Sequence, residues 1–171
     1  MSVIAEQPKV QSLFQKAQRI LSLEGYLLDS KRWDEWLDLY AKDAEYWVPA
    51  WKDDLSVTED PARELSLIYY PNRAGLEDRV FRIKSGKSLA STPLPRTCHM
   101  MNIARVARRD DGLVEADCSW SVYSYRLEKA AHLFGLSNYL LKETETGFQI
   151  KKRRTLVHSD TIPNVLDIYS I

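Results

Sequence analysis

Alternation of apolar and polar residues between Glu115 and Val122 constrains the fold more than any other feature of the sequence. The apolar positions are Ala116, Cys118, Trp120 and Val122. A period of two is typical of a strand that buries one face, so we expect Trp120 in the core. Three turn-forming segments, RRDDG, RLEKA and ETETG, divide residues 97–158. This region therefore predicts four consecutive antiparallel strands.

The first part of the chain has helical periodicity instead. Apolar residues at intervals of three and four predict an amphipathic helix over residues 12–28. A second, short helix is predicted next, because Trp33, Trp36 and Tyr40 fall on one stripe while the acidic residues point elsewhere. We expect these three aromatic side chains in the core, where they hold the second helix against the sheet.

Two strands and a third helix complete the pattern. The segments AEYWVPAW (44–51) and ELSLIYY (64–70) are rich in strand-forming residues, and RAGLEDRVFRIKSG (73–86) has helical spacing. The order helix, helix, strand, strand, helix and four strands predicts an α+β fold. In it, about three helices pack on one face of a strongly curved, mainly antiparallel sheet.

Composition and charge limit the class of protein. A chain of 171 residues with 44% hydrophobic residues predicts a single domain over 1–171, with residues 1–10 as a flexible N-terminus. The 24 basic residues balance 24 acidic ones, so there is no global field to attract nucleic acid. Apolar runs of membrane-spanning length and a signal peptide are absent from the sequence, which predicts a cytoplasmic protein without a membrane partner.

The cysteines and histidines do not predict a metal site. Cys98 and Cys118 are expected on neighbouring strands, too far apart along the sheet for a disulfide, and to be buried free thiols. His99 is predicted several rows from His132 and His158, and the simplest register puts those two on opposite faces. We therefore expect no metal or cofactor to be bound by this chain itself.

Two charged stretches offer other chemistry. Most acidic residues between 29 and 45 are expected on the solvated side of the second helix, while Asp43, at a helix-to-strand junction, is a candidate general base. The run KKRR (151–154) is predicted to alternate between two faces and form a basic edge or a patch for an acidic partner.

Strands 97–107 and 132–142 carry apolar residues at both odd and even positions, so both faces of each strand are apolar. In a sheet with one solvated face, apolar and polar residues alternate more strictly. Two explanations stay open: the chain's own helices and loops cover both faces, or another protein buries the outer face.

Three segments together resemble a known family: LLDSKRWDEWLDLYAKDAEYWVPAW (27–51), SLIYYPNRAGLEDRVFRIKSG (66–86) and PLPRTCHMMNI (93–103). They are similar to the small (β) subunits of aromatic-ring-hydroxylating dioxygenases, which are Rieske non-heme iron oxygenases. The second segment looks most like the branch acting on benzoate, toluate or anthranilate.

The resemblance implies a cone-shaped NTF2-like fold and a structural, non-catalytic β subunit in an α3β3 hexamer, in contact with α and other β subunits. It implies that the α subunit holds a Rieske [2Fe-2S] cluster and mononuclear Fe(II), and that NADH supplies electrons through a separate reductase. The complex would dihydroxylate an aromatic acid with O₂. From its charges and its place between strand and helix, we expect residues 70–79 to form a subunit interface. The residues concerned are Tyr70, Asn72, Arg73, Glu77, Asp78 and Arg79.

The alternative is an autonomous acid–base enzyme of the isomerase or dehydratase type, which would use the cavity of the same cone. In that hypothesis Asp43 or His99 is the base, and Tyr46 or Tyr69 orients the substrate.

Overall fold

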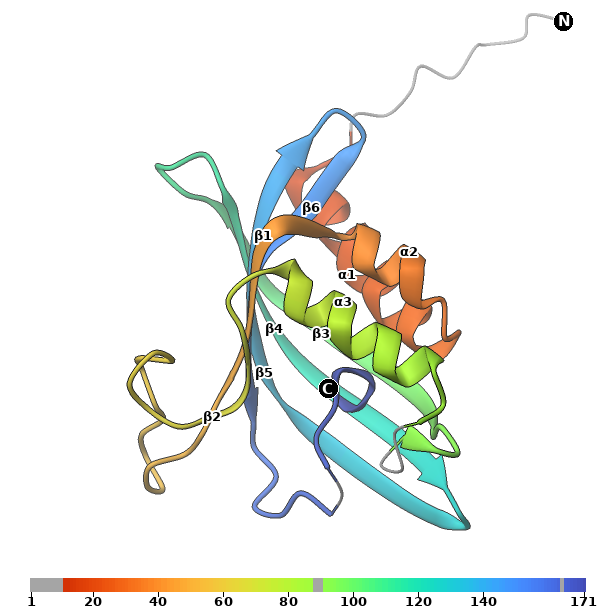
Figure 1. Ribbon diagram of the computed structural model, residues 1–171. Coiled ribbons are helices and arrows are strands. Elements are labelled where there is room, and N and C mark those ends of the chain that lie inside the picture. The colour runs from red at the N-terminus through yellow and green to blue at the C-terminus, as the bar shows by residue number, and fades with distance from the viewer. Residues whose placement is uncertain (1–10, 88–90, 164) are drawn as a thin grey trace, which may run out of the picture.

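The computed structural model describes residues 11–87, 91–163 and 165–171, so the predicted flexible N-terminus (1–10) lies outside the described residues. Helices α1 (Leu13–Asp29), α2 (Trp33–Asp38) and α3 (Arg73–Lys84) lie on one face of a six-stranded sheet (Figure 1). The strands are β1 (Tyr40–Pro49), β2 (Ser66–Tyr70), β3 (Arg96–Arg108), β4 (Val114–Arg126), β5 (Lys129–Thr144) and β6 (Gly147–Val157). The predicted α+β class and element order are confirmed.

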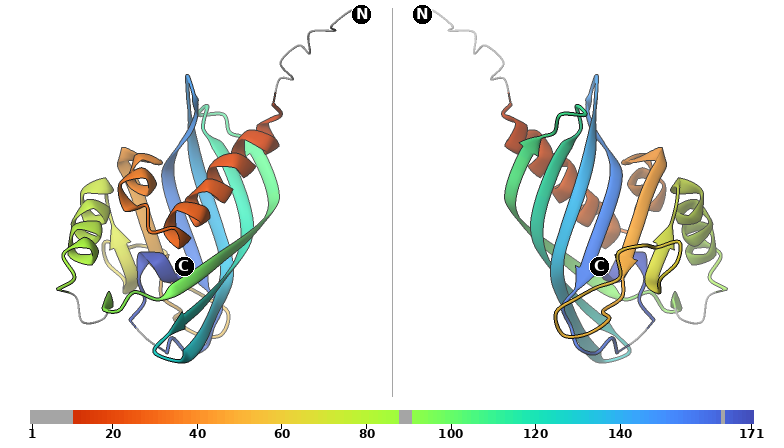
Figure 2. Two further views of the ribbon diagram at one scale, coloured as in Figure 1. Left: turned by 90° about the vertical axis from the view of Figure 1, so that its right-hand side faces the viewer. Right: turned by 90° about the vertical axis from the view of Figure 1, so that its left-hand side faces the viewer.

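The sheet has the order β2-β1-β6-β5-β4-β3. Strands β3 to β6 form the predicted antiparallel meander, and β1 joins it by pairing in parallel with β6. In the right-hand view of Figure 2, the strands face the viewer and the helices lie behind them. The sheet thus has a helix-covered inner face and an outer face without a helix from the described part of the chain. None of the described helices is long and apolar enough to cross a membrane.

Helix α1 begins as its sequence predicts. The side chain of Ser12 accepts a hydrogen bond from the backbone N–H of Gln15, whose own side chain bonds the Ser12 backbone in return. This reciprocal cap satisfies donors that a helix start leaves unpaired. The inward stripe contains Leu21 and Leu28, but also Glu24, which is 1% exposed.

Tyr40 differs from the prediction, because it belongs to β1 and not to the second helix. Helix α2 ends at Asp38, and Tyr40 pairs with Ile150 of β6. Its ring still packs on Trp36, with the ring centroids 4.9 Å apart, so the stripe continues across the helix end. Trp33, Trp36, Tyr40 and Trp120 all lie in the hydrophobic core.

Cys98 also differs from the prediction. Cys118 is buried on the inner face of β4, but Cys98 is exposed, because on β3 it shares the outer parity with Met100. Both cysteines are free, as expected.

The C-terminal residues fold back onto the inner face. The 3-10 helix η2 (Ile168–Ser170) buries Ile168 and Tyr169, and Ile171 is 1% exposed. The carboxylate of Asp167 holds this segment to α3 through an ion pair with Arg79. In Figure 1 the C-terminus accordingly lies between the helices and the sheet.

Candidate functional site

An ion pair between Glu24 and Arg153 lies in the centre of the core. The Nη1 atom of Arg153 donates to Oε1 of Glu24 over 2.9 Å, and both side chains are at most 2% exposed. Tyr139 donates a 2.8 Å hydrogen bond to the other carboxylate oxygen, and Tyr40 donates a further one. The Arg153 guanidinium is thus paired, and the buried carboxylate has three donors.

The groups around this pair determine its protonation state. Burial opposes the charge on Arg153, but the neighbouring Glu24 carboxylate favours it, and the pKa of Arg153 is raised well above its ordinary value. Burial raises the pKa of Tyr40, Tyr46 and Tyr139, so these phenols stay protonated. Such a cluster has little capacity for acid–base chemistry, since each charged group already has its partner.

Regular alternation did not predict a buried Arg153. The predicted basic edge is wrong at this residue, because the register shifts opposite Lys151, between Leu140 and Leu141. The bulge directs Arg153 inward and leaves Lys151 to pair with Asp43 at the surface. The sequence did contain one indication of a buried ion pair, because Glu24 lies within the apolar stripe of α1.

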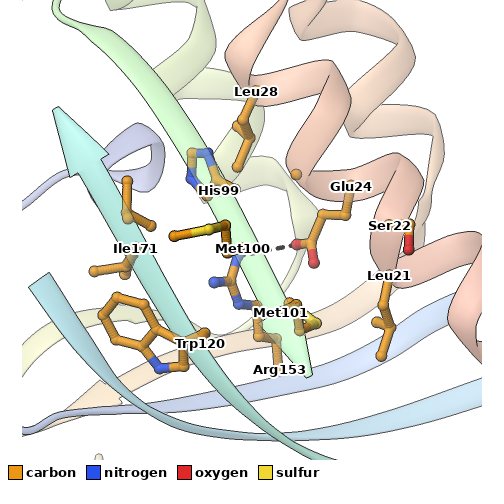
Figure 3. A pocket seen from close by; sticks show the side chains of 12 residues that line it. Leu21, Ser22, Glu24, Leu28, His99, Met100, Met101, Trp120, Arg153 and Ile171 are labelled. Carbon is orange, nitrogen blue, oxygen red and sulfur yellow. Dashed lines mark hydrogen bonds and ion pairs between the residues drawn. The ribbon is translucent and has the colours of Figure 1, made fainter. Parts of the chain in front are cut away.

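A cavity of about 310 Å³ lies between α1 and the inner face of the sheet. Its walls come from α1, β3, β4 and β6, with Ile171 from the C-terminal segment (Figure 3). Leu28 and His99 lie at one end, and Trp120 and Arg153 at the other. Of the candidate residues predicted for acid–base chemistry, only His99 contributes to this wall.

Asp29, the last residue of α1, fixes the position of His99 on β3. Its carboxylate accepts hydrogen bonds from His99 Nδ1 (2.6 Å), the His99 backbone N–H (2.9 Å) and the Thr97 hydroxyl (2.7 Å). Gly25 permits this close approach, since a Cβ there would lie 2.9 Å from Cβ of His99. Asp29 is therefore not on a solvated face of the second helix. Burial opposes its charge, yet the bonds from His99 and Thr97 lower the pKa of Asp29.

The other candidates for the alternative enzyme lie elsewhere. The side chain of Asp43 is 74% exposed and pairs with Lys151, which lowers its pKa. Tyr46 faces inward against Arg153, with 5.2 Å between its ring centroid and the guanidinium carbon. Tyr69 pairs with Trp47 and shares its outer face. The structure does not bring Asp43, His99, Tyr46 and Tyr69 together.

His132 and His158 lie on the same side of the sheet, so their predicted separation onto opposite faces is wrong. The His132 ring stacks on the Phe134 ring at a centroid distance of 5.5 Å, and the His158 ring meets the Phe134 ring edge to face at 6.4 Å. The register shift between Leu140 and Leu141 places His158 opposite Phe134, one residue from the simplest register, and so moves it to the same face as His132. Within residues 11–87, 91–163 and 165–171, no group of three or more His, Cys, Asp or Glu side chains could hold a metal ion.

Comparison with known proteins agrees with this architecture. The family described as "Ring hydroxylating beta subunit" matches residues 23–164. The 2-halobenzoate 1,2-dioxygenase small subunit of Burkholderia cepacia is 41% identical over 148 residues, covering 86% of this chain and 90% of that one. The anthranilate 1,2-dioxygenase small subunit of Acinetobacter baylyi is 41% identical over 153 residues, covering 90% and 94%.

Solved structures give the same result. The β subunit of benzoate 1,2-dioxygenase from Burkholderia mallei superposes with a TM-score of 0.75 at 39% identity, covering 96% of this chain and 100% of that chain. An NTF2-like protein with a cystatin-like fold from Novosphingobium aromaticivorans superposes with a TM-score of 0.55 at 14% identity, over 86% and 83%, which shows an NTF2-like fold. The chain therefore belongs to the family of ring-hydroxylating dioxygenase β subunits.

Proposed function

We propose that this chain is the structural, non-catalytic β subunit of a dioxygenase that acts on an aromatic acid of the benzoate or anthranilate type. The relatives named above act on such acids, according to their names. In this proposal, three α and three β subunits form the oxygenase. The α subunit holds a Rieske [2Fe-2S] cluster and mononuclear Fe(II), and a separate reductase delivers electrons from NADH.

The exposed outer face of the sheet is the observation that carries the proposal. Four large apolar side chains on β3, β4 and β5 are each about half exposed: Met100 (47%), Tyr123 (51%), Phe134 (44%) and Leu136 (48%). Exposed apolar patches of this kind mark protein–protein contacts in soluble proteins. Of the two explanations left open for the doubly apolar strands, the second accounts for these side chains, because the described helices all cover the inner face.

Aromatic rings form a continuous row across this face. Tyr123 stacks on His132 at 4.3 Å, His132 stacks on Phe134, and His158 links Phe134 to Trp51. Such rings bury much apolar surface with little loss of conformational freedom, which is why they are enriched at interfaces. Beside this row, a groove of about 390 Å³ is lined by Leu136, Leu156 and Arg154 among others. It offers both apolar contact and a charge to a partner side chain.

The segment 70–79 is proposed as a second contact region. Asn72, Glu77 and Asp78 are exposed on or next to α3. Arg73 bonds Glu77 and the backbone carbonyl of Tyr40, and Arg79 bonds Asp167 and Ser91. Charge reversal at Arg79 would therefore disturb the C-terminal segment as well, so Asp78→Lys is the cleaner test of the interface.

Isolation of the chain from its native cells under gentle conditions tests the proposal. We expect a larger, coloured partner in equal number, with iron and acid-labile sulfide in the complex and a native mass that fits three copies of each chain. A colourless chain recovered alone would contradict the proposal.

Substitution on the outer face tests which surface makes the contact. Phe134→Glu is expected to prevent recovery of the iron-containing partner. Leu55→Glu is the matched control, because Leu55 is 95% exposed in the segment between β1 and β2. Recovery of the intact complex with Phe134→Glu would exclude this face as the interface.

An autonomous acid–base enzyme remains the second candidate, because Asp29 orients His99 beside a cavity. Replacing a general base lowers the rate about 10²-fold or more. If the chain is a scaffold, His99→Ala should leave the turnover of the assembled oxygenase nearly unchanged. A loss of about 10²-fold in an activity of the isolated chain would instead support the enzyme.

A further inference from the structure

The cavity beside His99 contains a polar atom without a partner. The Nε2 atom of His99 is buried and has no hydrogen-bond partner among the described residues, and the side chain as a whole is 9% exposed. Buried polar groups are nearly always hydrogen-bonded in folded proteins, because an unpaired one loses its contact with water and gains nothing in return. An unpaired ring nitrogen in the wall of a cavity therefore indicates a hydrogen-bonding occupant of that cavity.

The hydrogen bond to Asp29 sets what this nitrogen offers. The Asp29 carboxylate can only accept, so the hydrogen on His99 lies on Nδ1. In the neutral ring Nε2 then carries a lone pair and accepts a hydrogen bond from whatever occupies the cavity. The complementary group is a hydrogen-bond donor, such as a hydroxyl.

The remaining walls exclude a strongly charged occupant. Glu24 and Arg153 reach the cavity as a pair, with the carboxylate also bonded by two tyrosines, so neither calls for a counter-ion. Most of the other lining groups are apolar, namely Leu21, Leu28, Met101, Val122, Trp120 and Ile171. Methionine sulfur and the indole ring both favour contact with an aromatic ring.

We propose that this cavity binds a small neutral aromatic molecule with one hydroxyl group, a phenol, whose hydroxyl donates to His99 Nε2 while its ring packs between α1 and the sheet. A volume of about 310 Å³ is at the lower end for ligand sites, which suits a single substituted ring. This site lies within the β subunit on its inner face, opposite the proposed interface.

Fluorine NMR on the purified full chain tests the site with 4-fluorophenol and 4-fluorotoluene. The two probes match in shape, but only the phenol can donate to His99. We expect saturable binding of both, with the phenol about tenfold tighter, which is the size of one hydrogen bond. In His99→Asn the amide can still donate to Asp29, but the Nε2 acceptor is gone, so the phenol should bind no better than the toluene.

Two further variants locate the site. Val122→Phe fills the cavity next to His99 and should abolish binding of both probes. His132→Asn makes the same substitution on the outer face and should leave both affinities unchanged. Absence of saturable phenol binding to the folded wild-type chain would overturn the proposal, as would an unchanged phenol preference in His99→Asn.

Discussion

Asp29 and His99 are 70 residues apart in sequence, yet Oδ1 of Asp29 lies 2.6 Å from Nδ1 of His99. This contact joins the end of α1 to the start of β3, and it orients the unpaired Nε2 atom of His99 in the wall of the cavity. The Asp29 carboxylate thus holds α1 against β3 and also orients the His99 nitrogen that is proposed to bond the ligand.

The stability contributed by Asp29 should depend on pH. Its pKa in the folded chain is below the ordinary value of 3.8, so the unfolded chain takes up the proton first as the pH falls. The contribution is therefore fully present above about pH 5 and is lost as the pH falls through the folded-state pKa. We expect Asp29→Asn to lower the free energy of unfolding at pH 7, with a difference from wild type that shrinks below about pH 4. Urea denaturation of both chains across this range measures it; a constant difference would contradict the assignment.

Trp36→Ala should destabilise the chain by about 3 to 5 kcal/mol, because the side chain is 0% exposed and its removal leaves a large void. Phe81→Ala is the control, since Phe81 is 73% exposed and its loss should cost less than about 1 kcal/mol. Chemical denaturation compares the two. A loss below about 1 kcal/mol for Trp36→Ala would show that this residue does not support the core.

Glu24→Gln should cost about 3 to 5 kcal/mol, because it leaves the buried Arg153 charge without its counter-charge. Asp34→Asn removes the exposed Asp34–Lys84 pair and should cost at most about 1 kcal/mol. Equal effects of the two substitutions on the free energy of unfolding would mean that the internal pair is not needed for stability.

The two cysteines should differ in reactivity. Burial raises the pKa of Cys118 to about 12, so it has almost no thiolate at neutral pH, whereas Cys98 is exposed on the outer face. Iodoacetamide should modify the folded wild-type chain once, as read by mass spectrometry, and Cys98→Ser should abolish the reaction. Protection of Cys98 in the assembled oxygenase would support the outer face as the interface, while rapid labelling of Cys118 would contradict its burial.

Local patterns in the sequence were enough to predict the elements and their order. The alternation around Trp120, the turn segments of the meander and the helical spacing that begins at Ser12 each depend on neighbours within a few residues. The three quoted segments also carried the family resemblance, which the comparisons confirmed. These features can be predicted from the sequence because strand and helix periods are properties of consecutive residues.

Only the tertiary structure decided which polar residues meet. The bulge at Lys151 directs Arg153 toward Glu24, and the same register shift places His158 opposite Phe134. Asp29 reaches His99 because α1 approaches β3 closely at Gly25. No local sequence pattern indicates a contact between residues so far apart in the chain. A shift of one residue in strand register exchanges inside and outside, so the polar core and the cavity follow from pairing between distant segments.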